Sequence, residues 1–302
     1  MLAQTIDSVF HVEQSRCFMK FCDLHTHSYF SDGTDSPKEI IEMAEKIGLS
    51  AVALCDHNTI DGVGELLEAG KCSTVKAVPG IELSTDYGET ELHILGLFIP
   101  TNAYHKVKAY ADALLDKKEE SNKDMIARLV KDGYDITYEV IKAKTPTGRF
   151  NRSHIASHLA EKGYVKDVKE AFSTLLAKES KYYVPVKRVD SLDAIKFLRS
   201  IGAVPVLAHP FLDLTEEQLV GFLPMAVEAG LAGMEVYHPS HDEECRQKAM
   251  DLVRLHGLLP SGGSDYHGTR KPGIHLGTGE GNLQIPYTFC TDIEFYSTNA
   301  TR

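Results

Sequence analysis

His25 and His27, separated by one residue, follow a short apolar segment near the start of the chain. Side chains at positions i and i+2 of a strand point to the same side, so both imidazoles would face one point in space. Such a pair suits a divalent metal ion of borderline softness. Asp32, in a turn five residues after His27, could serve a neighbouring ion. An isolated pair of this kind is at least as often one buried core histidine and one surface histidine, so the rest of the chain must decide.

Other residues of metal-binding type follow, or lie within, further apolar segments that predict strands. They are His57, Glu82, His93, His209, Asp265 and His267. In folds that alternate strands and helices, the carboxyl ends of the strands meet at one edge, where chemistry is located. We therefore expect these side chains to converge with the first pair. Composition gives no reason for such a distribution of the 14 histidines, so a coincidental set of core histidines is the much weaker explanation.

With Asp32 included, the nine candidate ligands are too many for one ion, and a carboxylate can bridge two. We therefore expect two or three divalent ions that share ligands. Clustered ions lower the pKa of a bound water, so that hydroxide attacks at neutral pH. They also hold phosphate oxygens as charge moves during phosphoryl chemistry.

The strands and helices that must position these residues alternate along much of the chain. Apolar runs predict strands at 19–22, 51–54, 75–82, 91–98, 203–208, 233–236 and 258–263. Helical patterns occur at 37–47, 63–69, 194–201, 219–229 and 243–256. The first helix has a capping box of Ser36 and Glu39, and Pro224 should kink or split a later one. The order predicts an α/β fold with a parallel sheet or barrel, and an irregular tail after Gly277.

Between residues 104 and 178 the pattern becomes helical and more polar, which predicts a helical insertion over the strand ends. Residues 1–103 and 179–302 would form the barrel, with 1–18 as an extension. Helices are expected at 107–115, 119–132, 140–144, 153–162 and 168–178. Arg149, Arg152 and His154 lie together at one helix start, where anions bind favourably. The alternative for this cluster is a solvated basic loop.

Charge and composition limit the function classes. The formal net charge of −11 disfavours binding to long nucleic acids, but bound cations would still allow a small anionic substrate. No apolar run reaches membrane-spanning length, and the first residues do not resemble a secretory leader. The six cysteines are scattered without a Cys-x-x-Cys pair, which is typical of a reduced cytoplasmic protein. No feature indicates a protein partner.

In their sequence context these residues resemble the PHP (polymerase and histidinol phosphatase) family of metal-dependent phosphoesterases. The resemblance runs in order from about residue 20 to about residue 270. Its motifs are Asp23-Leu24-His25-Thr26-His27, Ser31-Asp32-Gly33, Asp56-His57-Asn58, Pro79-Gly80-Ile81-Glu82, Leu92-His93-Ile94-Leu95-Gly96, Ala208-His209-Pro210 and Ser264-Asp265-Tyr266-His267. The resemblance implies a distorted (β/α)7 barrel, related to amidohydrolase barrels, with metals at the carboxyl ends of its strands.

The resemblance also implies how the ligands would be shared. One ion would be held by His25, His27, Glu82 and Asp265. A second would be held by Glu82, His93 and His209, with Glu82 bridging. A third would be held by Asp32, His57 and His267. The family commonly uses Mn, Zn or Fe, and nitrogen and oxygen ligands without sulfur do not choose among them.

Two further segments are similar to stand-alone members of the family. Arg152-Ser153-His154-Ile155-Ala156 resembles a segment of nucleoside phosphate phosphatases in which the Arg and His reach the substrate phosphate. Residues 263–273 resemble members that open small cyclic phosphates. The resemblance therefore implies a small phosphorylated substrate, either a nucleotide or a cyclic phosphate.

The resulting hypothesis is a hydrolase of small phosphate esters in which metal-activated hydroxide attacks phosphorus. His154 or His209 could protonate the leaving oxygen, and Arg152 would stabilise the phosphate oxygens. The substrate-binding residues would be Arg149, Arg152, His154, Tyr237 and His238. For the last two, ordinary packing is an equal alternative.

Three other functions stay open at this point. The first is an exonuclease that acts on short oligonucleotides. The second is a non-catalytic barrel that binds metal or ligand. The third, an amidohydrolase acting on a C–N bond, is disfavoured because an Arg/His pair suits phosphate better than an amide.

Overall fold

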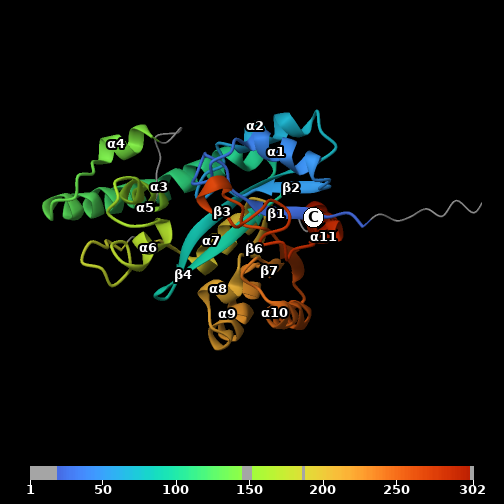
Figure 1. Cartoon of the computed structure of the whole chain (residues 1–302). Coiled ribbons are helices and arrows are strands. Elements are labelled where there is room, and N and C mark those ends of the chain that lie inside the picture. Colours follow the sequence, from blue (N-terminus) through green and yellow to red (C-terminus); the bar gives the residue numbers. More distant parts are fainter. Residues whose placement is uncertain (1–18, 145–151, 186–187, 300–302) are drawn as a thin grey trace, which may run out of the picture.

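The computed structural model describes residues 19–144, 152–185 and 188–299. In this part of the chain, eight strands form one sheet that curves into a nearly closed barrel (Figure 1). They are β1 (Cys22–Thr26), β2 (Ala51–Leu54), β3 (Lys76–Tyr87), β4 (Thr90–Leu97), β5 (Val189–Asp190), β6 (Val204–Leu207), β7 (Gly233–Tyr237) and β8 (Leu259–Gly262). The strands neighbour one another in the order β1-β2-β3-β4-β6-β7-β8, and β5 pairs with β3. The predicted α/β barrel is confirmed, although the first strand begins three residues later than predicted.

The chain that follows β8 returns to β1 and brings the two ends of the sheet together. The backbone N–H of Asp265 donates to the carbonyl of His25 at 2.9 Å, and that of His27 donates to the carbonyl of Tyr266 at 2.8 Å. Gly263 permits this approach, because a Cβ at its position would lie 2.1 Å from the Cβ of His25. The first and last ligand motifs of the sequence are therefore neighbours in space.

β4 departs from the parallel sheet that the strand–helix order predicts. It runs antiparallel to both β3 and β6, because a short turn at Gly88 joins β3 directly to β4. Gly88 has a φ of 61°, which glycine adopts without strain. This reversal places His93, near the start of β4, at the same barrel end as the carboxyl ends of the parallel strands.

Helices cover the outside of the barrel (Figure 1). They are α1 (Pro37–Lys46), α2 (Val63–Gly70), α7 (Ser191–Ser200), α8 (Pro210–Asp213), α9 (Glu216–Ala229), α10 (Glu243–His256) and α11 (Tyr287–Asn299). α1 has the predicted capping box, in which Ser36 Oγ accepts from Glu39 N and the Glu39 carboxylate accepts from Ser36 N. α9 continues through Pro224, so of the two predicted effects, a kink or a split, the split does not occur. Within the described ranges, no helix has both the length and the apolar character needed to cross a bilayer.

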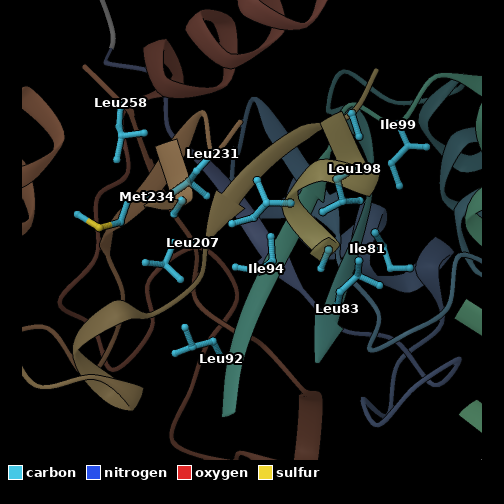
Figure 2. Close-up of a cluster of buried hydrophobic side chains, with 14 of the residues drawn as sticks. Ile81, Leu83, Leu92, Ile94, Ile99, Leu198, Leu207, Leu231, Met234 and Leu258 are labelled. Atoms are coloured by element: carbon cyan, nitrogen blue, oxygen red, sulfur yellow. The ribbon is translucent and has the colours of Figure 1, made fainter. Parts of the chain in front are cut away.

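The largest cluster of buried apolar side chains lies between the sheet and the helices α7, α9 and α10 (Figure 2). The β3–β4 hairpin contributes Ile81, Leu83, Leu92 and Ile94 to it. A second cluster joins β1, β2, β4 and β6 to α11, which buries Cys290 and Ile293. The prediction of an irregular tail is therefore wrong, because this tail ends in a helix that is part of the barrel core.

A group of helices stands to one side of the barrel, at the left of Figure 1. It consists of α3 (Tyr104–Lys131), which follows the short η1 (Thr101–Ala103), and of α4 (Tyr138–Ala143), α5 (Arg152–Glu161) and α6 (Val168–Ser173). α3 is one helix where the sequence predicted two. Its first part packs on the barrel through Val107 and Ala111, and its second part packs on α4–α6 through Met125 and Leu129. The limits of the insertion at 104 and 178 stay a prediction.

Candidate metal centre

Glu82, a buried residue of β3, lies at the centre of the predicted ligands. Its Oε2 atom is 3.4 Å from His25 Nε2, 3.2 Å from His27 Nε2 and 3.0 Å from His57 Nδ1. His25 and His27 are fully buried and face the same point, as the strand periodicity predicts. His57 arrives from the loop after β2, which is the neighbour of both β1 and β3 in the sheet.

The second oxygen of Glu82 faces a different pair of imidazoles. Oε1 lies 2.8 Å from His93 Nδ1 and 3.2 Å from His209 Nε2. These two nitrogens are 3.3 Å from each other. Because the two carboxylate oxygens face separate sets of nitrogens, Glu82 has the geometry of a bridge between two cations.

A third group lies beside the first. Asp32 Oδ1 is 3.3 Å from His267 Nε2 and 3.9 Å from His57 Nε2, and His27 Nδ1 lies 4.0 Å away. Asp265 Oδ1 is 3.2 Å from His27 Nε2. The geometry therefore adds His27 to the group of Asp32, His57 and His267 that the resemblance implied.

The donor atoms fit a cluster of divalent cations. Several buried donor and acceptor atoms at the centre have no hydrogen-bond partner among the described residues. They are His25 Nε2, His27 Nδ1 and Nε2, His57 Nδ1 and Glu82 Oε2. Each unpaired buried polar atom costs about 1–3 kcal/mol, which a metal–ligand bond would offset. Imidazole nitrogen and carboxylate oxygen are suitable ligands for Mn, Fe and Zn.

The carboxylates shift the titration of the surrounding imidazoles. Burial by itself lowers the pKa of His93, but Glu82 and Glu91 outweigh it and raise that pKa to about 10. Burial raises the pKa of Glu82, and His57, His93 and His25 outweigh it and hold that pKa well below its ordinary value. A divalent cation would compete with protons for the same nitrogen atoms.

Glu235 holds two of the candidate ligands in place and was not singled out from the sequence. This fully buried β7 residue places Oε1 3.1 Å from His25 Nδ1, and its Oε2 accepts the backbone N–H of His209 at 2.7 Å. His209 has a strained φ of 26°, and its Nδ1 lies 2.8 Å from Asp213 Oδ2. Such outer partners fix the orientation of metal-binding imidazoles. A lone carboxylate in an otherwise apolar strand was the available signal.

Two further buried carboxylates order the loops around the centre. Asp23 accepts from the backbone N–H and the hydroxyl of Ser264 at 2.9 and 2.5 Å. Asp56 accepts from the hydroxyls of Ser28 and Ser31 at 2.7 and 2.6 Å. Both aspartates belong to the motifs of the sequence, and the structure gives them a role in loop geometry rather than in direct ligation.

Arg152 forms part of the wall of a cavity of about 130 Å³ that also contacts Asp32, His57 and His93. Its guanidinium lies over the rings of Phe172 and Tyr183, with centroid distances of 5.6 and 5.2 Å. The structure thus brings this predicted phosphate-binding residue beside the metal centre. Arg149 lies outside the described residues.

Arg188 was missed by the sequence analysis and lines the same cavity. Its guanidinium donates to Asp86 Oδ1 at 3.1 Å and lies 2.8 Å from Glu91 Oε2. Glu91 Oε2 is also 3.8 Å from Arg152, and Glu91 Oε1 is 3.5 Å from His93 Nε2. Glu91 therefore links both arginines to a candidate metal ligand. A single arginine before a two-residue strand carries no sequence signal.

The remaining predicted site residues occupy different places. His238 Nε2 is buried 3.7 Å from Asp265 Oδ2, at the edge of the metal centre. Tyr237 packs its ring on Phe289 at a centroid distance of 5.9 Å, and its predicted contact with substrate stays a prediction. His154 is buried on α5, the helix that begins with Arg152.

Fold and site together define a barrel with a histidine and carboxylate metal centre. The chain belongs to the PHP family, because residues 23–183 match the model described as PHP domain. A phosphoribosyl 1,2-cyclic phosphate 1,2-diphosphodiesterase of Eggerthella lenta is 29% identical over 84% of this chain and 97% of its own length. A 5'-3' exoribonuclease of Haemophilus influenzae is 30% identical over 81% and 89%. A 3',5'-nucleoside bisphosphate phosphatase of Chromobacterium violaceum is 29% identical over 84% and 90%.

The solved structures that share this fold include two with a TM-score of 0.80. A Bifidobacterium adolescentis protein, described as a candidate metal-dependent phosphoesterase, has a TM-score of 0.80 and 29% identity and covers 91% of this chain and 95% of that chain. An amidohydrolase of Chromobacterium violaceum, solved with sulfate and no metal, has a TM-score of 0.80 and 26% identity and covers 93% and 99%. The family and the fold predicted from the motifs are both confirmed.

Proposed function

We propose that this protein is a metal-dependent phosphoesterase that hydrolyses small phosphate esters. The observation that carries the proposal is the position of Glu82, whose two oxygens face imidazoles on opposite sides, next to a cavity lined by Arg152 and Arg188. A bridged pair of cations beside guanidinium groups suits a phosphate better than an uncharged amide. The names of the similar curated proteins support the same class, since each acts on a phosphate ester.

The proposed cofactors are two or three divalent ions, with Mn, Zn and Fe as the candidates. When bound, they would supply Lewis acidity and lower the pKa of a water molecule. Glu82 would bridge two of them, with His25 and His27 on one side and His93 and His209 on the other. Asp32, His57 and His267 would hold the third, and Asp265 would join the first.

The arginines of the cavity and the two candidate catalytic histidines have separate proposed tasks. Arg152 and Arg188 orient the phosphate and stabilise charge on its oxygens. His209 acts as a ligand rather than as the acid, because its Nε2 faces Glu82 and its Nδ1 faces Asp213. His154 is the proposed proton donor to the leaving oxygen.

The helical segment 104–178 is proposed as an insertion that supplies one wall of the active site. α5 and α6 already provide Arg152, Ser153 and Phe172 to the cavity beside the metal centre. Such a wall would exclude water from the reacting phosphate. The scattered cysteines and the acidic net charge support a cytoplasmic location and a small substrate rather than a long nucleic acid.

Product formation from a panel of four substrates tests the proposal. The panel holds a 5'-nucleotide, a 3',5'-bisphosphate, a small cyclic phosphate and a dinucleotide, each with Mn and after chelation. Chromatography of the products is needed, because cyclic phosphates and dinucleotides can be cleaved without release of phosphate. Replacement of His57 or Asp265 by alanine should abolish turnover, while alanine at the exposed His105 of α3 should not. Turnover retained in both site variants would refute the site.

An exonuclease that acts on short oligonucleotides is the second candidate, favoured by the similarity to the Haemophilus influenzae exoribonuclease. In that case the dinucleotide would be the best substrate of the panel. The non-catalytic barrel is disfavoured because all nine predicted ligands are present, whereas a barrel that has lost its activity usually lacks some of them. No product from any substrate, in protein shown to carry its metals, would favour it again.

A further inference from the structure

Ser84 is a buried residue of β3 whose side chain reaches the cavity beside the metal centre. It lies two positions after Glu82, so both side chains point to the same face of the strand. In the antiparallel ladder it lies directly opposite His93. Only 5% of Ser84 is exposed, and it lines the cavity of about 130 Å³ that also contains Arg152. The hydroxyl of Ser84 therefore lies beside candidate metal ligands and a proposed phosphate-binding residue.

The neighbouring Asn58 determines which role the Ser84 hydroxyl can have. The amide oxygen of Asn58 accepts the backbone N–H of Ser84 at 3.1 Å, so an obligatory donor identifies the oxygen end of this amide. The Nδ2 group of Asn58 consequently donates to Ser84 Oγ, also at 3.1 Å. Ser84 Oγ is thus an acceptor toward Asn58, and its own proton must point elsewhere. The described part of the chain offers no acceptor for that proton.

Asn58 is held in this orientation by its backbone. It is buried and has a φ of 50°, a conformation that asparagine tolerates better than most residues. Its backbone N–H donates to the carbonyl of Glu82 at 2.8 Å, which joins the loop after β2 to β3. The amide therefore keeps the Ser84 proton turned away from itself before a ligand arrives. A donor that is oriented in advance loses little freedom on binding.

The other polar groups of the cavity indicate what would accept the Ser84 proton. Arg152 and Arg188 offer only donors. The two carboxylates of the wall have other partners, since Glu91 pairs with Arg188 at 2.8 Å and Asp32 belongs to the metal centre. A ligand in this cavity must therefore supply acceptor oxygens to several donor residues at once. A phosphate group, whose oxygens accept hydrogen bonds in several directions, meets this requirement.

We infer that Ser84 donates a hydrogen bond to an oxygen of the phosphate that is to be hydrolysed. The inference rests on the proposed phosphoesterase function and adds a residue that contacts the substrate. Asn58 is then a positioning residue, because it acts on the phosphate only through the Ser84 hydroxyl. Loss of one hydrogen bond to a charged phosphate oxygen should weaken phosphate binding about 10- to 100-fold.

Phosphate binding by the metal-loaded protein tests this inference. Calorimetry gives the dissociation constant of inorganic phosphate, and steady-state kinetics give kcat/KM for the best substrate of the panel. The variants are Ser84→Ala, which removes the donor, and Ser84→Cys, whose thiol is a weak donor of similar size. The matched control is Ser200→Ala, which removes an exposed hydroxyl at the end of α7.

Both Ser84 variants should bind phosphate about 10- to 100-fold more weakly than the wild type and lose a similar factor in kcat/KM. Their Mn content and their unfolding free energy should stay close to those of the wild type, because Ser84 is not a metal ligand in this account. Ser200→Ala should match the wild type in every measurement. A purely structural role of Ser84 would not weaken phosphate binding while leaving the metal content unchanged.

The orientation imposed by Asn58 gives an independent test. Asn58→Asp keeps the shape of the side chain but presents an acceptor oxygen to Ser84 Oγ, so the hydroxyl would donate to that carboxylate instead of to phosphate. The substitution also adds a negative charge, whose effect is measured separately in the Ser84→Ala background. Phosphate affinity should therefore fall about 10-fold further in the wild-type background than in the Ser84→Ala background. Equal falls in the two backgrounds would overturn the inference.

The outcomes separate the inference from the function on which it rests. If the metal-loaded wild type hydrolyses no ester of the panel, the proposed function and the role of Ser84 fail together. If it hydrolyses an ester and the Ser84 variants bind phosphate as tightly as the wild type, the function stands and the inference is wrong. A reduced Mn content in these variants would show that Ser84 acts on the metal centre, which also contradicts the inference. Should Ser84→Ala fail to fold, Ser84→Cys must still bind phosphate more weakly, and an unchanged affinity would refute the assigned contact.

Discussion

Replacement of Glu235 by glutamine should weaken metal binding while leaving the fold intact. The carboxylate accepts from two donors at once, the backbone N–H of His209 and the imidazole of His25, at 2.7 and 3.1 Å. A glutamine of the same shape has one acceptor oxygen, so one donor would face an N–H group instead. Loss of such an outer partner costs about 10- to 100-fold in metal affinity, or about 1.4 to 2.7 kcal/mol.

Calorimetric titration of chelator-treated protein with Mn measures this effect directly. The matched control is Glu244→Gln on α10. The Glu244 carboxylate is exposed and forms an ion pair with the exposed side chain of Lys248, far in sequence from the metal ligands. Circular dichroism and denaturation of both variants show whether the fold is retained. A folded Glu235→Gln protein with the Mn affinity of the wild type would refute the assigned role of Glu235 in orienting His25 and His209.

Three other substitutions probe the binding wall, the pH response and the core. Glu91→Gln should lower kcat/KM about 10-fold, because Arg152 and Arg188 lose the carboxylate that positions them; steady-state kinetics that match the wild type would contradict this. Burial lowers the pKa of His241 to about 4, so its stabilising effect is complete above pH 6.5 and is lost as the pH falls toward 4. Between pH 7.5 and pH 5 the unfolding free energy of the wild type should therefore fall by about 2 kcal/mol more than that of His241→Gln. Urea unfolding of both proteins at the two pH values measures this difference, and equal losses would disprove the prediction. Leu198→Ala should cost about 3 kcal/mol of unfolding free energy, because Leu198 is fully buried in the cluster of Figure 2; a loss below about 1 kcal/mol in denaturant titrations would show that the site is poorly packed.

The ligand set could be predicted because its signals are local. The pairing of His25 with His27 depends only on strand periodicity, and that of Asp265 with His267 lies in one short motif. The strands around them are short apolar runs bounded by polar residues, which the sequence displays directly. In a barrel, residues at such positions converge irrespective of the details of packing.

The features that were missed depend on contacts between distant segments. β4 is antiparallel because a short turn at Gly88 joins it directly to β3, whereas the overall alternation of strands and helices predicted a parallel sheet. Arg188 acquires its role from Glu91 and Asp86, residues about 100 positions earlier in the chain. The role of Glu235 as a partner of the metal ligands can be recognised only in the folded barrel, where β1 and the end of β6 bring His25 and His209 to it. The apolar residues of α11 do not form a clear stripe along one face of the helix, and its burial is decided by the barrel surface on which it packs.

The most direct test of the metal-dependent mechanism is ester hydrolysis by chelator-treated protein during stepwise return of Mn, with bound metal counted by elemental analysis. The substrate is the best one from the four-member panel, and Glu82→Gln serves as the variant without the bridging carboxylate. We predict that activity is absent after chelation and returns in proportion to bound metal in the wild type, while the variant binds less metal and stays inactive. Full activity in metal-free protein, or in Glu82→Gln, would contradict the account.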